Sequence, residues 1–170
     1  LAYAPAGGIG AYVGYNEGSR TPTAIELGCA DPENPCRLPN AMAGDPPLKQ
    51  VVTKTWEAGV RGKLADVAHW SAGVFRAENH DDILFVADNQ AGFGYFKNFG
   101  KTRHQGVELA AGGKAGALDF GVNYTWLQAT YQSREVVNGS ANSSSDADAP
   151  GLEGNIVITP GNRIPLTPSH

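Results

Sequence analysis

The stretch "LDFGVNYTW", residues 118–126, alternates apolar or aromatic residues with small or polar ones. Side chains on a β-strand point alternately to opposite faces, so this pattern predicts a strand with one apolar face and one polar face. Residues 9–15, 54–62, 68–76 and 104–111 show the same period of two. No apolar run with helical spacing exceeds about two turns. The sequence therefore predicts an all-β, antiparallel fold.

The composition excludes two classes of protein. The chain has 170 residues and a formal net charge of −4, and it has no basic tract, which argues against a nucleic-acid partner. No stretch has the roughly 20 apolar residues that a transmembrane helix needs, since the uncharged residues 1–15 are interrupted by Pro5 and several glycines. Both ends look cut, with no signal peptide, so we expect a part of a longer protein.

The connections between the predicted strands alternate in length. Residues 62–66 and 112–117 are expected to be short turns, whereas about 17–52, 78–101 and 132–161 are long loops. In an antiparallel sheet this order puts all short turns at one end and all long loops at the other, which is typical of outer-membrane β-barrels. The middle loop is predicted to hold a hairpin, on strands 67–87 and 93–111. The last loop is rich in Ser, Asn and Asp and is expected to be solvated.

The alternation leaves two interpretations of the apolar face: it contacts lipid, or it packs in the core of a soluble β-sandwich. Aromatic residues near strand ends and the many alanines and glycines favour lipid, although a sandwich explains the alternation equally well. The residues predicted to face lipid are Trp56, Trp70, Phe120, Tyr124 and Trp126. Those predicted to face a water-filled lumen are Glu57, Arg61, Glu108 and Asp119.

Three segments resemble the barrel region of TonB-dependent outer-membrane receptors. In residues 14–62 the similar positions are Arg20, Pro22, Thr23, Glu26 and Leu27, then Asp45 to Leu48, then Thr55, Glu57, Gly59 and Arg61. In residues 95–111 they are Asn98, Gly100, Gly106, Val107 and Glu108. Residues 161–170 resemble the start of the following strand, through Ile164, Pro165, Pro168 and His170.

The resemblance implies a transmembrane β-barrel of about 22 strands with a plugged lumen, of which residues 1–170 would be a central slice of about five to six strands. The plug domain, the TonB box and the C-terminal strand of such receptors would lie outside it. The implied function is uptake of a scarce nutrient (a ferric siderophore for iron uptake, cobalamin or an oligosaccharide), driven by TonB, ExbB and ExbD, without enzyme activity. The alternatives are a soluble β-sandwich binding module and an accessory domain of an extracellular hydrolase, either with glycan-binding loops.

The resemblance also guides the candidate sites. Cys29 and Cys36 flank "ADPENP" and are predicted to form a structural disulfide, because disulfides persist outside the inner membrane; metal or redox chemistry is the alternative. Ligand contacts are expected from loop residues. The candidates are Arg20, His80, Asp81, Asp82, Tyr95 and Lys97. His80 beside two aspartates suggests a metal site, but a solvated rim is the favoured interpretation, and no metal, cofactor or catalytic triad is expected.

Overall fold

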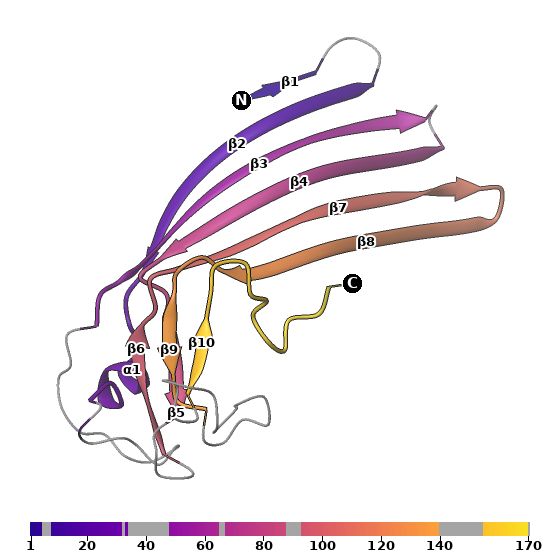
Figure 1. The fold of residues 1–170 in the computed structure, drawn as a ribbon. Helices are drawn as coiled ribbons and strands as arrows, with labels where there is room; N and C mark the ends of the chain where they lie inside the picture. The colour runs from indigo at the N-terminus through magenta and orange to yellow at the C-terminus, as the bar shows by residue number, and fades with distance from the viewer. Residues whose placement is uncertain are drawn as a thin grey trace.

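One antiparallel sheet dominates the computed structural model, which describes residues 1–4, 8–31, 33, 48–64, 67–87, 93–139 and 155–169. The six strands lie side by side in the order β1-β2-β3-β4-β7-β8 (Figure 1). Their bounds are Ala2–Tyr3 (β1), Ile9–Arg20 (β2), Val51–Leu64 (β3), Ala68–His80 (β4), Lys101–Ala115 (β7) and Leu118–Tyr131 (β8). The predicted all-β antiparallel class is confirmed, and each of the five periodic segments lies in one of the five long strands.

The turns between long strands are shorter than the sequence indicates. β3 continues to Leu64 and β7 to Ala115, so most of residues 62–66 and 112–117 belongs to strands. Glycines at 112 and 113 do not end β7, because their backbones stay paired with β4 and β8. The chain reverses instead at Gly116, whose φ of 64° is in the left-handed region that glycine adopts without strain.

The long connections gather at the opposite end of the sheet (Figure 1). This loop end carries α1 (Ala24–Gly28), β5 (Ile83–Ala87), β6 (Gly94–Asn98), β9 (Glu135–Val137) and β10 (Ile156–Ile158). β5 pairs with β6 as the sequence predicts, although the tip between them lies outside the described residues. The predicted sorting of short and long connections is therefore present in the fold.

Two elements of the loop end differ from the sequence interpretation. The range 132–161 is not wholly an unpaired loop, because β9 and β10 form a small antiparallel pair through β-branched residues such as Val136 and Val157. The helix α1 was not anticipated. Thr23 caps it, since its hydroxyl accepts a hydrogen bond from the Glu26 amide while the Glu26 carboxylate accepts one from the Thr23 amide.

Among the described residues other than glycine, the buried ones lie at the loop end and not in the middle of the sheet. Phe99 is 1% exposed and Thr102 is fully buried, and the ring of Phe99 packs against that of Tyr131 with centroids 4.9 Å apart. Val51 and Ala129 are buried nearby at the same end. The small core therefore joins the ends of the long strands to the hairpins beyond them.

The last described segment runs beside β8. The amide of Tyr131 donates to the carbonyl of Asn162 at 2.9 Å, and the amide of Ile164 donates to the carbonyl of Ala129 at 3.0 Å. Further along, the Leu127 amide donates to the Ser169 carbonyl at 3.1 Å. This segment occupies the position of the next strand, as its sequence resemblance indicates; His170 itself lies outside the described residues.

Candidate functional site

The strand register sorts the side chains of the sheet into two faces. Residues paired directly across neighbouring strands share a face, and the pairs Tyr15–Trp56, Val60–Ala72, Ala72–Leu109 and Leu109–Tyr124 connect one face across the sheet. We call it the apolar face. Its members on the five long strands include Ile9, Ala11, Val13, Tyr15, Trp56, Ala58, Val60, Trp70, Ala72, Val74, Val107, Leu109, Ala111, Leu118, Phe120, Val122, Tyr124 and Trp126.

The apolar face is open to its surroundings. Trp56 is 58% exposed, Val74 is 54% exposed and Val122 is 63% exposed. The rings of Tyr15 and Trp56 lie against each other at the loop end, with centroids 4.7 Å apart. A soluble monomer rarely exposes a continuous apolar surface of this extent. All five residues predicted to contact lipid lie on it.

Polar side chains bound the apolar face towards the loop end. In the row of Trp56, Arg76 Nε donates to Gln105 Oε1 at 3.0 Å, and Gln105 Nε2 donates to Gln128 Oε1 at 2.8 Å. The next row holds the ion pair of Arg103 Nη2 with Glu78 Oε1, at 2.6 Å. The apolar character therefore stops within one step of the register, as it does where a membrane protein leaves the hydrocarbon layer.

The opposite surface, which we call the polar face, carries the four residues predicted to meet water: Glu57, Arg61, Glu108 and Asp119. Within the described ranges, the first three form no ion pair, and Asp119 pairs only with Lys114, at 3.5 Å, where both side chains are exposed. The arrangement is a hydrated surface in which charges need no protein partner.

Most strand glycines lie on the polar face. Among the described strands these are Gly10, Gly14, Gly18, Gly59, Gly73, Gly106, Gly112 and Gly121. The hydroxyl of Tyr12 lies above Gly59 and Gly73, and Phe75 lies above Gly106. At these positions larger side chains thus lie over bare backbone.

Arg20, the first ligand candidate, is held by an ion pair at the end of β2. Its Nη1 lies 2.7 Å from Glu26 Oε2 and its Nη2 donates to Glu26 Oε1 at 3.1 Å. Burial alone would raise the pKa of Glu26, but the hydrogen bonds from Arg20 and Thr23 outweigh it and hold that pKa below its usual range. Arg20 therefore fixes the start of the α1 segment.

The carboxylate of Asp82 is occupied by internal hydrogen bonds where β4 leads into β5. It accepts from the hydroxyl of Thr102 at 2.5 Å and from the Ile83 amide at 3.0 Å. Asn79 Nδ2 donates to Thr102 Oγ1 at 3.1 Å. Asp81 has a φ of 53°, so the chain bends here between the long strand and the hairpin.

The other candidates lie around this bend. His80 ends β4 and pairs with Lys101, and Asp81 lies 3.9 Å from the amine of Lys49. Tyr95 and Lys97 are on β6, where Lys97 Nζ forms an ion pair with Glu135 of β9 at 3.1 Å. The structure thus collects all six candidates at the loop end but divides them among separate contacts instead of one cluster.

Sequence reasoning missed a cavity of about 410 Å³ at the loop end. It lies between β5, the β9–β10 pair and residues 162–165, and its lining includes Phe85, Tyr131, Val157 and Arg163. The short β-branched runs at 136–137 and 156–158 were the sequence signal for the strands that form one wall of this cavity. Their pairing depends on a fold that brings residues far apart in sequence together.

The predicted disulfide lies partly outside the described residues. Cys29 follows α1 and is 2% exposed, and its carbonyl accepts a hydrogen bond from the Phe96 amide at 2.6 Å. Cys36 is not among the described residues, so the pairing stays a prediction. In the part of the chain that the structure describes, no group of three or more His, Cys, Asp or Glu side chains could hold a metal ion. No helix there is both long and apolar enough to span a membrane.

A comparison with protein families gives a match over residues 1–170 to the model described as "TonB dependent receptor-like, beta-barrel". The chain belongs to the TonB-dependent receptor barrel family. The resemblance noted in the sequence is therefore confirmed. TonB-dependent receptor barrels are outer-membrane proteins of a transporter family and not of an enzyme family. For a TonB-dependent barrel, the open apolar face, the sorted turns and the polar loop-end boundary are the expected features of a membrane wall.

Proposed function

We propose that this chain is a segment of the wall of a TonB-dependent outer-membrane receptor that takes up a scarce nutrient. The apolar face contacts lipid and the polar face lines the lumen. The observation that carries the proposal is the division of one sheet into an exposed apolar face and a charged, glycine-rich face, with all long connections at one end. At the tilt of such strands, the nine positions from Leu118 to Trp126 span about 20–25 Å along the membrane normal, which matches the apolar band of such barrels.

The segment acts as part of a larger assembly. An open six-stranded sheet cannot enclose a channel, whereas a barrel of about 22 strands can hold a plug. We infer that the rest of the receptor supplies the other strands and the plug, and that TonB, ExbB and ExbD supply the energy for uptake. The nutrient is a ferric siderophore, cobalamin or an oligosaccharide.

The loop end is the side from which the nutrient enters. Tyr95 and Lys97 on β6, together with the cavity beside β9 and β10, combine aromatic, cationic and apolar groups that suit a large chelate. Arg20, His80 and Asp81 lie at the same end and are the remaining proposed contacts. Asp82 supports the site indirectly, because its carboxylate is already engaged by Thr102 and the Ile83 amide.

A soluble β-sandwich explains the structure less well. A sandwich core would cover Trp56 and Val74 with a second sheet, but both are more than half exposed. No second sheet covers the apolar face in the described part of the chain. A glycan-binding accessory domain of an extracellular hydrolase would need the same covered core.

Neighbouring cysteine variants of the complete receptor test the orientation. Ser71 and Ala72 are adjacent on β4 and lie on opposite faces. In intact outer membranes, Ser71→Cys should react with a membrane-impermeant maleimide, whereas Ala72→Cys should be protected until the membrane is dissolved. The reverse pattern, or equal reactivity of the two variants in membranes, would refute the proposed orientation.

Uptake tests the activity. A strain lacking the receptor gene, complemented with the gene, should regain growth on at least one member of a panel of ferric chelates, cobalamin and oligosaccharides. That growth should disappear when tonB is deleted. Growth that is independent of TonB would contradict the proposed energy source.

A further inference from the structure

The cavity of about 410 Å³ at the loop end has two hairpins as walls. Lys97 of β6 and Glu135 of β9 form an ion pair at 3.1 Å that joins these hairpins. Lys97 lies opposite Leu84 in the β5–β6 register, and Glu135 lies opposite Ile158 in the β9–β10 register. Residues that pair directly share a face, so the ion pair lies beside two side chains that line the cavity. It therefore holds the two walls together next to the cavity.

The walls of the cavity are aliphatic. The lining contains Leu84 and Val86 from β5, and it contains Val137, Ile156 and Ile158 from the β9–β10 pair. These side chains offer no hydrogen-bond donor or acceptor, so they suit an apolar group and not the hydroxyls of a sugar. Ligand cavities in proteins have volumes of about 300–1,000 Å³, and this cavity lies near the lower end of that range. The walls therefore suit a single apolar group of moderate size.

The cavity also contains a cation. Arg163 is the one charged side chain among the described residues of the lining. Its Nη2 donates a long hydrogen bond, of 3.3 Å, to the Thr167 carbonyl, whereas its Nε and Nη1 donate to no described residue. The planar guanidinium presents its donors as a fork that matches the two oxygens of a carboxylate. Charge complementarity thus favours an anionic ligand.

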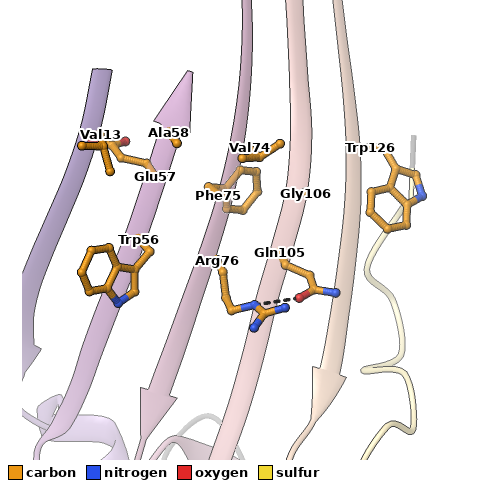
Figure 2. A pocket seen from close by; sticks show the side chains of 10 residues that line it. All are labelled: Val13, Trp56, Glu57, Ala58, Val74, Phe75, Arg76, Gln105, Gly106 and Trp126. Atoms are coloured by element: carbon orange, nitrogen blue, oxygen red, sulfur yellow. Dashed lines mark hydrogen bonds between the residues drawn. The ribbon is translucent and has the colours of Figure 1, made fainter. Parts of the chain in front are cut away.

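A groove on the apolar face also contains an arginine, but its surroundings differ. Arg76 lines this groove, and its Nε donates to Gln105 Oε1 at 3.0 Å (Figure 2). In the proposed orientation the groove meets lipid. The hairpins that enclose the cavity lie beyond the end of the long strands (Figure 1), so a ligand of the cavity comes from the aqueous side.

We propose that this cavity binds an organic carboxylate with an apolar body, that is, an acyl or aryl carboxylate. The apolar body lies between the two hairpins and the carboxylate lies on Arg163. The inference rests on the proposed function, because the loop end is the side from which that function admits the nutrient. It narrows the ligand to a nutrient with an acyl or aryl carboxylate. A neutral sugar would leave Arg163 without an anion, and inorganic phosphate would leave the aliphatic walls empty.

Protection of introduced cysteines in the complete receptor tests the site. Val137 lines the cavity, whereas Val136 is its neighbour on the opposite face of β9. In intact outer membranes, naphthalene-2-carboxylate should slow the reaction of Val137→Cys with a membrane-impermeant maleimide and leave Val136→Cys unaffected. The neutral naphthalene-2-carboxamide should need an about ten-fold higher concentration for the same protection, because it lacks the charge-assisted hydrogen bonds to Arg163. The receptor without an added cysteine gives the background reaction.

Two arginine variants identify the cationic partner. Arg163→Gln should remove the ten-fold difference between the acid and the amide. Arg134 is exposed just before β9 and does not line the cavity, so Arg134→Gln is the matched control and should keep the difference. Leu84→Cys, on the other wall, repeats the measurement if Val137→Cys fails to assemble.

The outcomes separate the site from the proposed function. Equal protection by the acid and the amide would overturn the carboxylate site, as would the absence of protection. A cavity whose cysteines react neither in intact nor in detergent-dissolved membranes is closed to solutes, which also overturns the site. None of these results would affect TonB-dependent growth. Reaction of the wall cysteines only after the membrane is dissolved would instead refute the proposed function, because the loop end would then not face the outside.

Discussion

Gly106 shows how strongly single residues shape the sheet. A Cβ at this position would meet the backbone carbonyl oxygen of Trp126 and the ring of Phe75, so neither neighbour leaves room for it. On the same face of the next strand, Gly121 has no atom within 4 Å of an added Cβ. The two glycines look alike in the sequence, and only the packing tells them apart.

We expect Gly106→Ala to destabilise the barrel by about 1–3 kcal/mol, as overpacking does in other proteins. Urea unfolding of the receptor in lipid vesicles, followed by gel mobility without boiling, measures the change. Gly121→Ala is the matched control and should unfold like the wild type. An equal loss of stability in both variants would mean that glycine is needed at these positions for a reason other than the close contact at Gly106.

The Arg20–Glu26 contact predicts a local dependence on pH. The pKa of Glu26 is lower in the folded protein than in the unfolded chain, so its stabilising contribution is complete above the ordinary carboxyl pKa, about 4.3. It is lost as the pH falls through the depressed folded value. Hydrogen exchange of amides 24–28 should therefore accelerate, relative to the intrinsic rate, below about pH 4. Glu26→Gln should remove this pH dependence, and a variant that keeps it would disprove the assignment.

Residue-level orientation was predictable because a strand has a fixed period. The alternation in 54–62 and 118–126 put Trp56 and Glu57, or Phe120 and Asp119, on opposite faces, and the register does the same. The ligand candidates were harder to predict. Whether Asp82 is available depends on Thr102, which is 20 residues away in the chain and adjacent only in the fold.

At the scale of elements, the bend between β4 and β5 is held by one buried network. Thr102 is 0% exposed, so protein atoms surround it completely. Its hydroxyl donates a hydrogen bond to the Asp82 carboxylate and accepts one from the Asn79 side chain. The network determines how the β5–β6 hairpin stands on the long strands.

We expect Thr102→Val to loosen this hairpin at a cost of about 1–3 kcal/mol, because it leaves the Asp82 carboxylate short of a donor. Hydrogen exchange should become about ten-fold faster in β5 and β6 and stay unchanged in the middle of β3. Thr125→Val, on the exposed polar face of β8, is the control and should leave exchange unchanged both in the β5–β6 hairpin and in β3. Uniform acceleration along all strands would instead indicate global destabilisation.

The cysteines stabilise the connection after α1 if they are joined. The eight-residue stretch from Cys29 to Cys36 closes a small loop, for which the chain-entropy estimate is about 2–3 kcal/mol. Mass spectrometry of a digest without reductant should find the two cysteines in one cross-linked peptide. Two alkylated free cysteines in the native receptor would contradict the prediction.

Elements were predictable where they are long and periodic, and less so where tertiary contacts create them. β8 could be located from its alternation alone. α1 has only five residues and depends on the Thr23 cap and Arg20. β9 and β10 have three residues each, and they exist because they pair with each other across a long connection. The residues of each strand taken alone do not predict that the two strands pair.

The whole molecule is expected to depend on its surroundings. Residues 1–170 produced alone in buffer should aggregate, because the apolar face is open and residues 118–126 of β8 present backbone groups without a partner strand among the described residues at the outer edge of the sheet. Light scattering in plain buffer, compared with a mild detergent, measures this. A sharply folded monomer in buffer would contradict the membrane interpretation and favour a soluble domain.

The bare backbone beneath Tyr12 and Phe75 has a mechanical consequence. At Gly59, Gly73 and Gly106 of the polar face, glycine leaves the backbone bare and the side chains of Tyr12 and Phe75 lie over it, so the surface is locally shallow there. Friction between two packed proteins grows with the interlocking of their surfaces, and a smooth lining keeps it low. If the polar face lines a plugged lumen, as proposed, the patch around Tyr12 and Phe75 is where a moving plug meets the least mechanical resistance.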